Sequence, residues 1–197
     1  MCGMNNNISF TSLIKPVGFG TFHTITSRMA KSSYVDYPWT LKEATLASDV
    51  FTKKVMDCSV YIISDGQKAK MYHICPGCDD AKNFERIEKD LETTIDLTSE
   101  NLEAFILGAK PPYKVGQSSY ELFEKFEKLS NKHNIPTTIL KGGSGERSFA
   151  YSSSTDTLYI ANTEPFNRST KPLTSPLDIL RNWFDTVKIH PKDSVTM

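Results

Sequence analysis

Two hydrophobic periods alternate along the middle of the chain. Apolar residues at helical spacing predict a helix that begins near Asn83 and an amphipathic helix over 118–133. Short runs rich in β-branched and aromatic residues predict strands between and around these helices. The predicted strands cover 58–63, 69–74, 105–109, 135–140, 148–151 and 157–161.

A turn signal joins the first two predicted strands into a hairpin. Residues 64–66 are Ser, Asp and Gly, a combination that favours a tight reversal of the chain. The hairpin places Cys58 at the start of one strand and His73 at the end of the next. We therefore expect both side chains at the same end of a two-stranded unit.

The two ends of the chain carry weaker patterns. A short strand is predicted over 20–26. Thr40 and Glu43 have the capping-box spacing and predict a helix that ends near Asp49. Ser175 followed by Pro176 predicts the start of a final helix that continues to about Val187. Helices and strands do not alternate steadily, which favours an α+β layered sandwich over a doubly wound parallel sheet.

Composition and charge exclude several classes of protein. The 197 residues are enough for one globular domain, and 39% of them are hydrophobic. The 23 basic residues balance 23 acidic residues, so we expect neither a nucleic-acid partner nor a membrane-surface partner. The polar, Asn-rich start and the lack of a long apolar run predict neither secretion by the general route nor membrane insertion.

The four cysteines, at positions 2, 58, 75 and 78, are too few and too unevenly spaced for a disulfide framework. A cysteine nucleophile needs a base in spatial contact, and the predicted hairpin supplies His73 for Cys58. Thr52, six residues before Cys58, is a candidate to orient the imidazole. The alternative is that Cys58 is a small core residue, which is the usual role of a cysteine in an apolar strand.

This spacing resembles that of the CheD chemoreceptor glutamine deamidases and of toxin domains of the cytotoxic necrotizing factor type. Those enzymes have a Thr, a Cys six residues later and a His on the following strand, as Thr52, Cys58 and His73 are arranged here. The sequence MYHICP at 71–76 also resembles the family pattern around the histidine.

The order of downstream features is similar to that of the same family. The matching features are Gly108 and Ala109, the helix over 118–133, Ile135 and Pro136, Gly142 and Gly143 with Arg147, and the aromatic strand with Phe149 and Tyr151. The resemblance implies a layered α/β/β sandwich of CheD-like deamidase type over 40–164. We expect an N-terminal extension, partly disordered, over 1–39 and a C-terminal helical extension packing on the core over 165–197.

The resemblance also implies a reaction, the deamidation of a protein glutamine to glutamate. Cys58 would form a thioester, His73 would act as base and then acid, and Thr52 would orient His73. No cofactor and no metal are expected, and the partner is a protein substrate that bears the target glutamine. Interception of the thioester by an amine would make the enzyme a transglutaminase instead. We expect a monomer.

One departure from the family leaves alternatives open. The family has Gly and Ser just before the cysteine, where this chain has Met56 and Asp57. A catalytically silent, CheD-like protein-binding module is therefore the alternative function. A zinc or redox centre at His73, Cys75 and Cys78 is a third interpretation, although no second ligand pair completes it. The extensions, together with the missing signal peptide, suggest a bacterial effector or toxin, cytoplasmic or delivered into a host cell.

Overall fold

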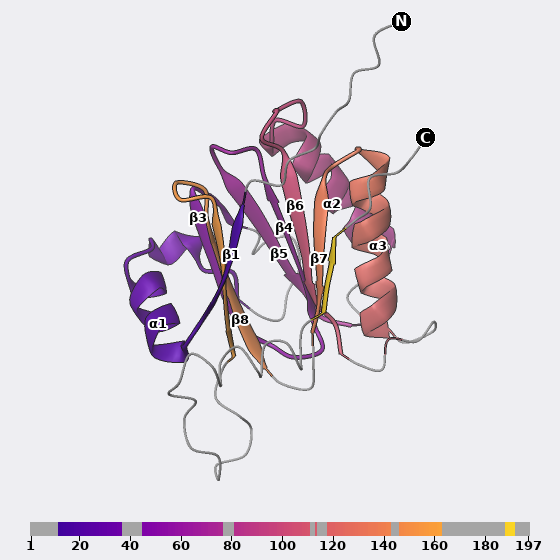
Figure 1. Ribbon diagram of the computed structural model, residues 1–197. Coiled ribbons are helices and arrows are strands. Elements are labelled where there is room, and N and C mark those ends of the chain that lie inside the picture. Colours follow the sequence, from indigo (N-terminus) through magenta and orange to yellow (C-terminus); the bar gives the residue numbers. More distant parts are fainter. Residues whose placement is uncertain are drawn as a thin grey trace, which may run out of the picture.

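Two β-sheets lie face to face in a computed structural model of the chain, with helices on their outer sides (Figure 1). The structure describes residues 12–36, 45–76, 81–110, 113, 118–142, 146–162 and 188–191. Within these residues the first sheet has the order β1 (Leu13–Val17), β9 (Thr157–Asn162), β8 (Arg147–Ser152), β3 (Asp49–Val55). The second has the order β10 (Lys188–Pro191), β7 (Thr137–Lys141), β6 (Glu103–Gly108), β4 (Ser59–Ser64), β5 (Ala69–Ile74), β2 (Thr45–Ala47).

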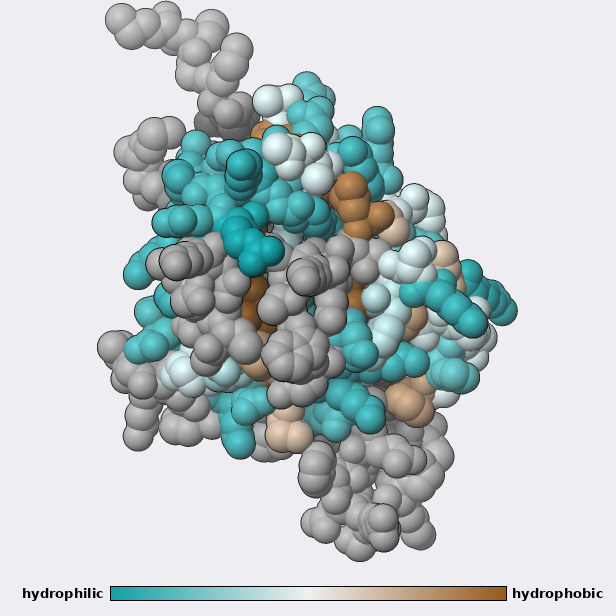
Figure 2. Space-filling view, turned by 180° about the vertical axis from the view of Figure 1, so that it is seen from behind, coloured by the Kyte–Doolittle hydropathy of each residue, from teal (hydrophilic) through white to brown (hydrophobic). Residues whose placement is uncertain are grey.

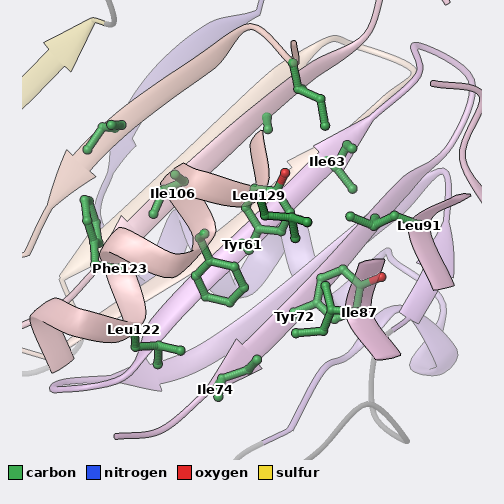
Figure 3. Close-up of a cluster of buried hydrophobic side chains, with 14 of the residues drawn as sticks. Tyr61, Ile63, Tyr72, Ile74, Ile87, Leu91, Ile106, Leu122, Phe123 and Leu129 are labelled. Atoms are coloured by element: carbon green, nitrogen blue, oxygen red, sulfur yellow. The ribbon is translucent and has the colours of Figure 1, made fainter. Parts of the chain in front are cut away.

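Three layers of side-chain packing hold these elements together. Alternate residues of β4, such as Val60 and Ile62, point into the core between the sheets. The intervening residues, such as Tyr61, point to the opposite face, which α2 (Ala81–Thr94) and α3 (Ser118–Lys132) cover. Figure 3 shows this second core, where side chains from the strands and both helices converge around Tyr61. Both faces of β4 are buried, which explains its continuous apolar sequence.

The third layer of packing is formed by a helix, although the sequence predicted a strand over the same residues. The prediction over 20–26 is wrong, because residues Phe19–Ser27 form α1. Phe22 of α1 is fully buried against Phe51 on the outer face of the first sheet. The β-branched threonines of this helix form hydrogen bonds to the preceding turn, such as the one from the Thr26 hydroxyl to the Phe22 carbonyl at 3.0 Å.

The predicted helix ending near Asp49 is also wrong over its described part. Residues Thr45–Ala47 form β2 and pair with β5, and Asp49–Val55 form β3 and pair with β8. Strand pairing with distant segments therefore overrides the local capping pattern, whose residues Thr40 and Glu43 lie outside the described residues. The predicted final helix from Ser175 also lies outside them.

The predicted hairpin and the two central helices are confirmed. β4 and β5 pair in antiparallel fashion from Ser59 with Ile74 to Ser64 with Ala69. The first residues of α2 and α3 are Ala81 and Ser118, so α2 begins two residues before the predicted start. Helices and strands are mixed in two packed sheets, so the described chain is an α+β sandwich.

The described surface is mostly polar where it can be seen. In Figure 2 the apolar residues appear as small separate areas among hydrophilic ones. No helix in the described part of the chain is long and apolar enough to cross a membrane.

Two carboxyl groups, one buried and one partly exposed, lie close together at the end of the sandwich far from Cys58. Glu103, 6% exposed at the start of β6, accepts a hydrogen bond from the Tyr151 hydroxyl at 3.0 Å. The same hydroxyl lies 3.0 Å from Asp156, and the Ser12 hydroxyl contacts both carboxyl groups. Burial, with a smaller contribution from the negative charge of Asp156, raises the pKa of Glu103 to about 7.

Glu103→Gln is expected to stabilise the protein above neutral pH. The folded state binds a proton that the unfolded state releases between the ordinary pKa of 4.5 and about 7, so wild-type stability falls as pH rises through this window. Gln stays neutral, so the free energy of unfolding of the variant should exceed that of wild type by about 1–3 kcal/mol at about pH 8. Below about pH 4.5 the two should differ little. Urea unfolding across this range, with exposed Glu100→Gln as control, measures the difference. An equal gain at all pH values would contradict the titration of Glu103.

Candidate functional site

The register of the β4–β5 hairpin brings Cys58 and His73 to one face of the second sheet. Val60 pairs directly with His73, and Cys58 lies two residues before Val60. Paired residues share a face and alternate residues of a strand return to it, so Cys58 and His73 are diagonal neighbours. Diagonal neighbours lie about 7–8 Å apart, with their Cβ atoms somewhat closer, a separation that an imidazole can span. Both side chains are 2% exposed and face the first sheet.

Thr52 reaches the same imidazole from β3 of the facing sheet. Its Oγ1 lies 2.7 Å from His73 Nδ1 and 2.7 Å from the Val35 carbonyl oxygen. A carbonyl can only accept, so the hydroxyl hydrogen goes to Val35, and the Thr52 oxygen accepts a hydrogen bond from Nδ1–H. The proton of the neutral imidazole is therefore on Nδ1 and the lone pair is on Nε2. This is the tautomer in which Nε2 can act as a base.

Val35 is a site residue that the sequence did not single out. Its N–H donates to the Phe51 carbonyl at 2.9 Å, and Tyr34 forms a parallel bridge with Phe51. Residues 34–36 therefore run beside β3. This position places the Val35 carbonyl oxygen next to the Thr52 hydroxyl. This segment belongs to the region predicted as an N-terminal extension. A backbone carbonyl carries no side-chain signal, so only the three-dimensional structure reveals it.

Burial sets the protonation state of His73. Removal from water disfavours the imidazolium and lowers the pKa of His73 to about 4, while the negative charge of Asp36 opposes this with a smaller effect. At neutral pH the imidazole is therefore uncharged and able to accept a proton. The resting site does not hold a protonated imidazole, so any proton transfer from Cys58 accompanies its attack.

A close backbone approach holds the strand that carries Cys58. The Ala109 N–H donates to the Cys58 carbonyl at 3.0 Å. Gly108 has a φ of +98°, and a Cβ at this position would lie 2.5 Å from the same carbonyl oxygen. Gly142 N–H in turn bonds to the Gly108 carbonyl at 2.5 Å. The small pair Gly108 and Ala109, singled out in the sequence, therefore lets β6 end against the cysteine.

Met56 and Asp57, the residues that depart from the family pattern, do not strain the backbone before Cys58. Among the described residues, positive φ in this segment occurs only at Lys54, where the pairing of β3 with β8 shifts. The Asp57 side chain is exposed to solvent. Met56 and Asp57 thus lead into Cys58 without a conformation that favours glycine.

Arg147 supplies a buried positive charge at this end of the sandwich. It is 2% exposed, lies on the same face of β8 as Phe149 and is paired with Val55. Val55 Cγ1 would lie 3.3 Å from a Cβ on Gly108, which places this pair close to the end of β6 beside Cys58. Burial lowers the pKa of the guanidinium, which nevertheless remains charged. A buried cation at this end favours negative charge developing nearby.

The potential metal ligands within the described chain gather elsewhere. Glu88, Glu92 and His133 form the group with ligand atoms close enough to share an ion. Lys132 Nζ and His133 Nε2 lie 2.6 and 2.7 Å from Glu88 Oε1, so this carboxylate already has cationic or hydrogen-bonding partners. The alternative zinc centre needs Cys78, which lies outside the described residues. One possible ligand atom of that centre, His73 Nδ1, already bonds to Thr52.

Comparison with models of known protein families and with curated proteins finds no match to this chain. The function of this chain is therefore inferred from the geometry of the site. That geometry brings Thr52 and His73 into hydrogen-bond contact and sets Cys58 on the same sheet face as His73.

Thr52→Val is expected to lower the reactivity of Cys58 by about 10–100-fold, while Thr52→Ser keeps most of it. Valine has a similar shape but cannot accept from Nδ1–H, which frees the imidazole to adopt the other tautomer. The measurements are the alkylation rate of Cys58 and the ¹⁵N NMR shifts of the ring, which report the tautomer. A purely structural role for Thr52 would change stability in the Val variant without changing the ring shifts.

Proposed function

We propose that this chain is a cysteine-dependent protein-glutamine deamidase of CheD-like type. The observation that carries the proposal is the hydrogen bond between Thr52 and His73. Because the Thr52 hydroxyl donates to Val35, it fixes the imidazole in the tautomer that has its lone pair on Nε2. The register of the hairpin sets this imidazole on the sheet face that holds Cys58. These are the parts that a thiol nucleophile requires.

The proposed reaction follows from these groups. The Cys58 thiol gives its proton to His73 Nε2 as the sulfur attacks the carboxamide carbon of a glutamine side chain. The carbon–nitrogen bond breaks, and His73 returns the proton to the departing ammonia. Water then attacks the thioester with His73 again as base, which releases glutamate and restores the thiol. Overall, one water is consumed and one ammonia is formed.

The fold supports the same proposal. A two-sheet sandwich in which a buried hairpin carries Cys and His, with helices on its outer face, agrees with the layered α/β/β arrangement expected of the family. Helix α1 adds a layer on the outer face of the first sheet. The product would carry a negative charge in place of a neutral amide, enough to break a buried contact in the substrate protein.

One observation favours a second candidate function, a catalytically silent protein-binding module. Cys58 is 2% exposed, so a glutamine side chain must displace covering groups to reach the sulfur. A silent module would keep the sandwich and the Thr52–His73 contact without using the thiol.

Mass spectrometry of treated lysates distinguishes the two functions. Bacterial and eukaryotic lysates are incubated with wild-type protein, with Cys58→Ala or with Cys75→Ala, and glutamine-containing peptides are compared. A deamidase produces a gain of about one dalton at a glutamine with wild type and with Cys75→Ala, and none with Cys58→Ala. Shifts that do not depend on Cys58, or no shift in any lysate, would contradict the deamidase proposal.

A further inference from the structure

A second thiol lies opposite the proposed nucleophile. Ser59 and Ile74 form the last pair of the β4–β5 ladder, so the next positions outward are Cys58 and Cys75. Both side chains pack into the core between the two sheets, and both are thiols. Cys58 is buried, whereas Cys75 is partly exposed.

The direction of the backbone around Cys58 determines how close this pair lies. The Cys58 carbonyl accepts from Ala109 on the β6 side, so its polar backbone groups point away from β5. Cys58 and Cys75 therefore occupy a non-hydrogen-bonded position of the antiparallel ladder. At the turn, Asp65 N–H donates to the Lys68 carbonyl, so these two residues form a hydrogen-bonded pair. Hydrogen-bonded and non-hydrogen-bonded pairs alternate from there, and the alternation also makes Cys58 and Cys75 a non-hydrogen-bonded pair. Cα atoms at such positions lie about 4.5 Å apart, inside the range of about 4.4–6.8 Å that a disulfide spans.

The same sheet face also supplies a base for thiol chemistry. His73 lies two residues before Cys75 on β5, so Cys58, His73 and Cys75 share one face of the hairpin. The neutral imidazole can accept a proton from Cys58 when its sulfur attacks an electrophile. The partly exposed side of Cys75 gives a small oxidant an approach to the pair.

We propose that Cys58 and Cys75 form a reversible disulfide, with Cys75 as the resolving cysteine. The Cys58 sulfur attacks one oxygen of a hydroperoxide, the O–O bond breaks, and Cys58 becomes a sulfenic acid as an alcohol or water leaves. The Cys75 sulfur then attacks the sulfenic sulfur, which releases water and closes the disulfide. Each cysteine is oxidised by one electron and the hydroperoxide is reduced by two.

The disulfide would act as a switch on the site, and this regulatory meaning rests on the proposed function. With its sulfur bonded to Cys75, Cys58 cannot attack a carboxamide. The disulfide also protects Cys58 from further oxidation to the sulfinic acid, which thiols do not reverse. A thiol reductant would restore the nucleophile.

Disulfide mapping after oxidation tests the proposal on the full chain. Reduced protein is treated with hydrogen peroxide, blocked with N-ethylmaleimide, digested and analysed by mass spectrometry. We expect a Cys58–Cys75 linkage, about two daltons lighter than the two thiols, in wild type and in Cys78→Ser. In Cys75→Ser the linkage is lost, and Cys58 gains about 32 Da as the sulfinic acid.

Two results would overturn the proposal. One is a Cys75–Cys78 linkage that leaves Cys58 as a thiol in oxidised wild type. The other is equal conversion of Cys58 to the sulfinic acid in wild type and in Cys75→Ser. The mapping does not require a substrate, so its failure is separate from failure of the deamidase proposal. If deamidation occurs, oxidised wild type should regain it with dithiothreitol, whereas oxidised Cys75→Ser should not.

Discussion

His73→Gln is expected to slow glutamine deamidation by about 10²–10⁴-fold, the usual contribution of a positioned general base. Glutamine is similar in size to histidine and its amide can donate to Thr52, but it has no basic nitrogen to take the Cys58 proton. The hydrogen bond from Nδ1–H to Thr52 keeps a lone pair on Nε2 of the imidazole, and the variant has no such basic lone pair. The rate is measured as ammonia release, or as the mass gain of about one dalton on the substrate identified from the lysates.

His133→Gln is the matched control for this substitution. His133 contacts Glu88 on the helix side of the second sheet, away from the core that holds Cys58, so its replacement should leave the rate unchanged. Equal losses in the two variants would show that the effect is not specific to the site. A fully active His73→Gln variant would show that His73 takes no part in the reaction.

His73→Gln should also change how the stability of the protein depends on pH in acid. The folded pKa of His73, about 4, is below its ordinary value of 6.5, so the unfolded state binds the proton first as pH falls. The free energy of unfolding of wild type should therefore fall by about 3 kcal/mol between about pH 6.5 and 4 because of His73. In His73→Gln this part of the decrease should be absent. Urea unfolding at several pH values measures the difference in slope, which does not depend on how much Gln itself destabilises the core.

Gly108→Ala is expected to destabilise the fold by about 2–5 kcal/mol. The added Cβ would lie 2.5 Å from the Cys58 carbonyl oxygen, and the φ of +98° is unfavourable for any L side chain. Relief requires β6 to move away from Cys58, which also breaks the hydrogen bond from Ala109 N–H. The variant should therefore lose both stability and any activity that depends on Cys58.

Gly20→Ala is the matched control for the glycine substitution. Gly20 lies in α1, and nothing comes within 4 Å of a Cβ at that position. Alanine there should leave stability unchanged or raise it by up to about 1 kcal/mol, because alanine favours helix. Unfolding in urea compares the two variants with wild type. A Gly108→Ala protein as stable as wild type would contradict the close approach of β6 to Cys58.

Local sequence patterns predicted the elements whose apolar residues are continuous or strongly periodic. The hairpin of β4 and β5 was predictable because a polar turn over 64–66 separates two apolar runs. Helix α3 was predictable because its buried residues, such as Leu122 and Phe126, recur at helical spacing. These are the elements that form both sides of the second core.

Elements that depend on distant partners escaped prediction. β1 pairs in parallel with β9, far along the chain, and its sequence includes Pro16, which an edge strand tolerates. α1 is rich in β-branched threonines and is held by Phe22 against the first sheet. Glu103 and Asp156 meet only when β6 and the β8–β9 turn pack together.

The candidate site was predictable as residue types but not as a geometry. The spacing of Thr52, Cys58 and His73 drew attention to them, yet Thr52 and Cys58 lie on facing sheets. Between them the chain crosses from one sheet to the other, with a register shift between Thr52 and Val55. The tautomer of His73 depends on a backbone carbonyl, Val35 O, that no side-chain pattern reveals.

The alkylation rate of Cys58 tests the claim that Thr52 and His73 activate this thiol, without knowledge of the substrate. Wild type, Thr52→Val and His73→Gln are treated with iodoacetamide near neutral pH, and the modification of each cysteine is followed by peptide mass spectrometry. We predict that Cys58 reacts faster than Cys75 and Cys78 in wild type and that both substitutions slow it. Equal rates at the three cysteines, unchanged by the substitutions, would contradict the claim.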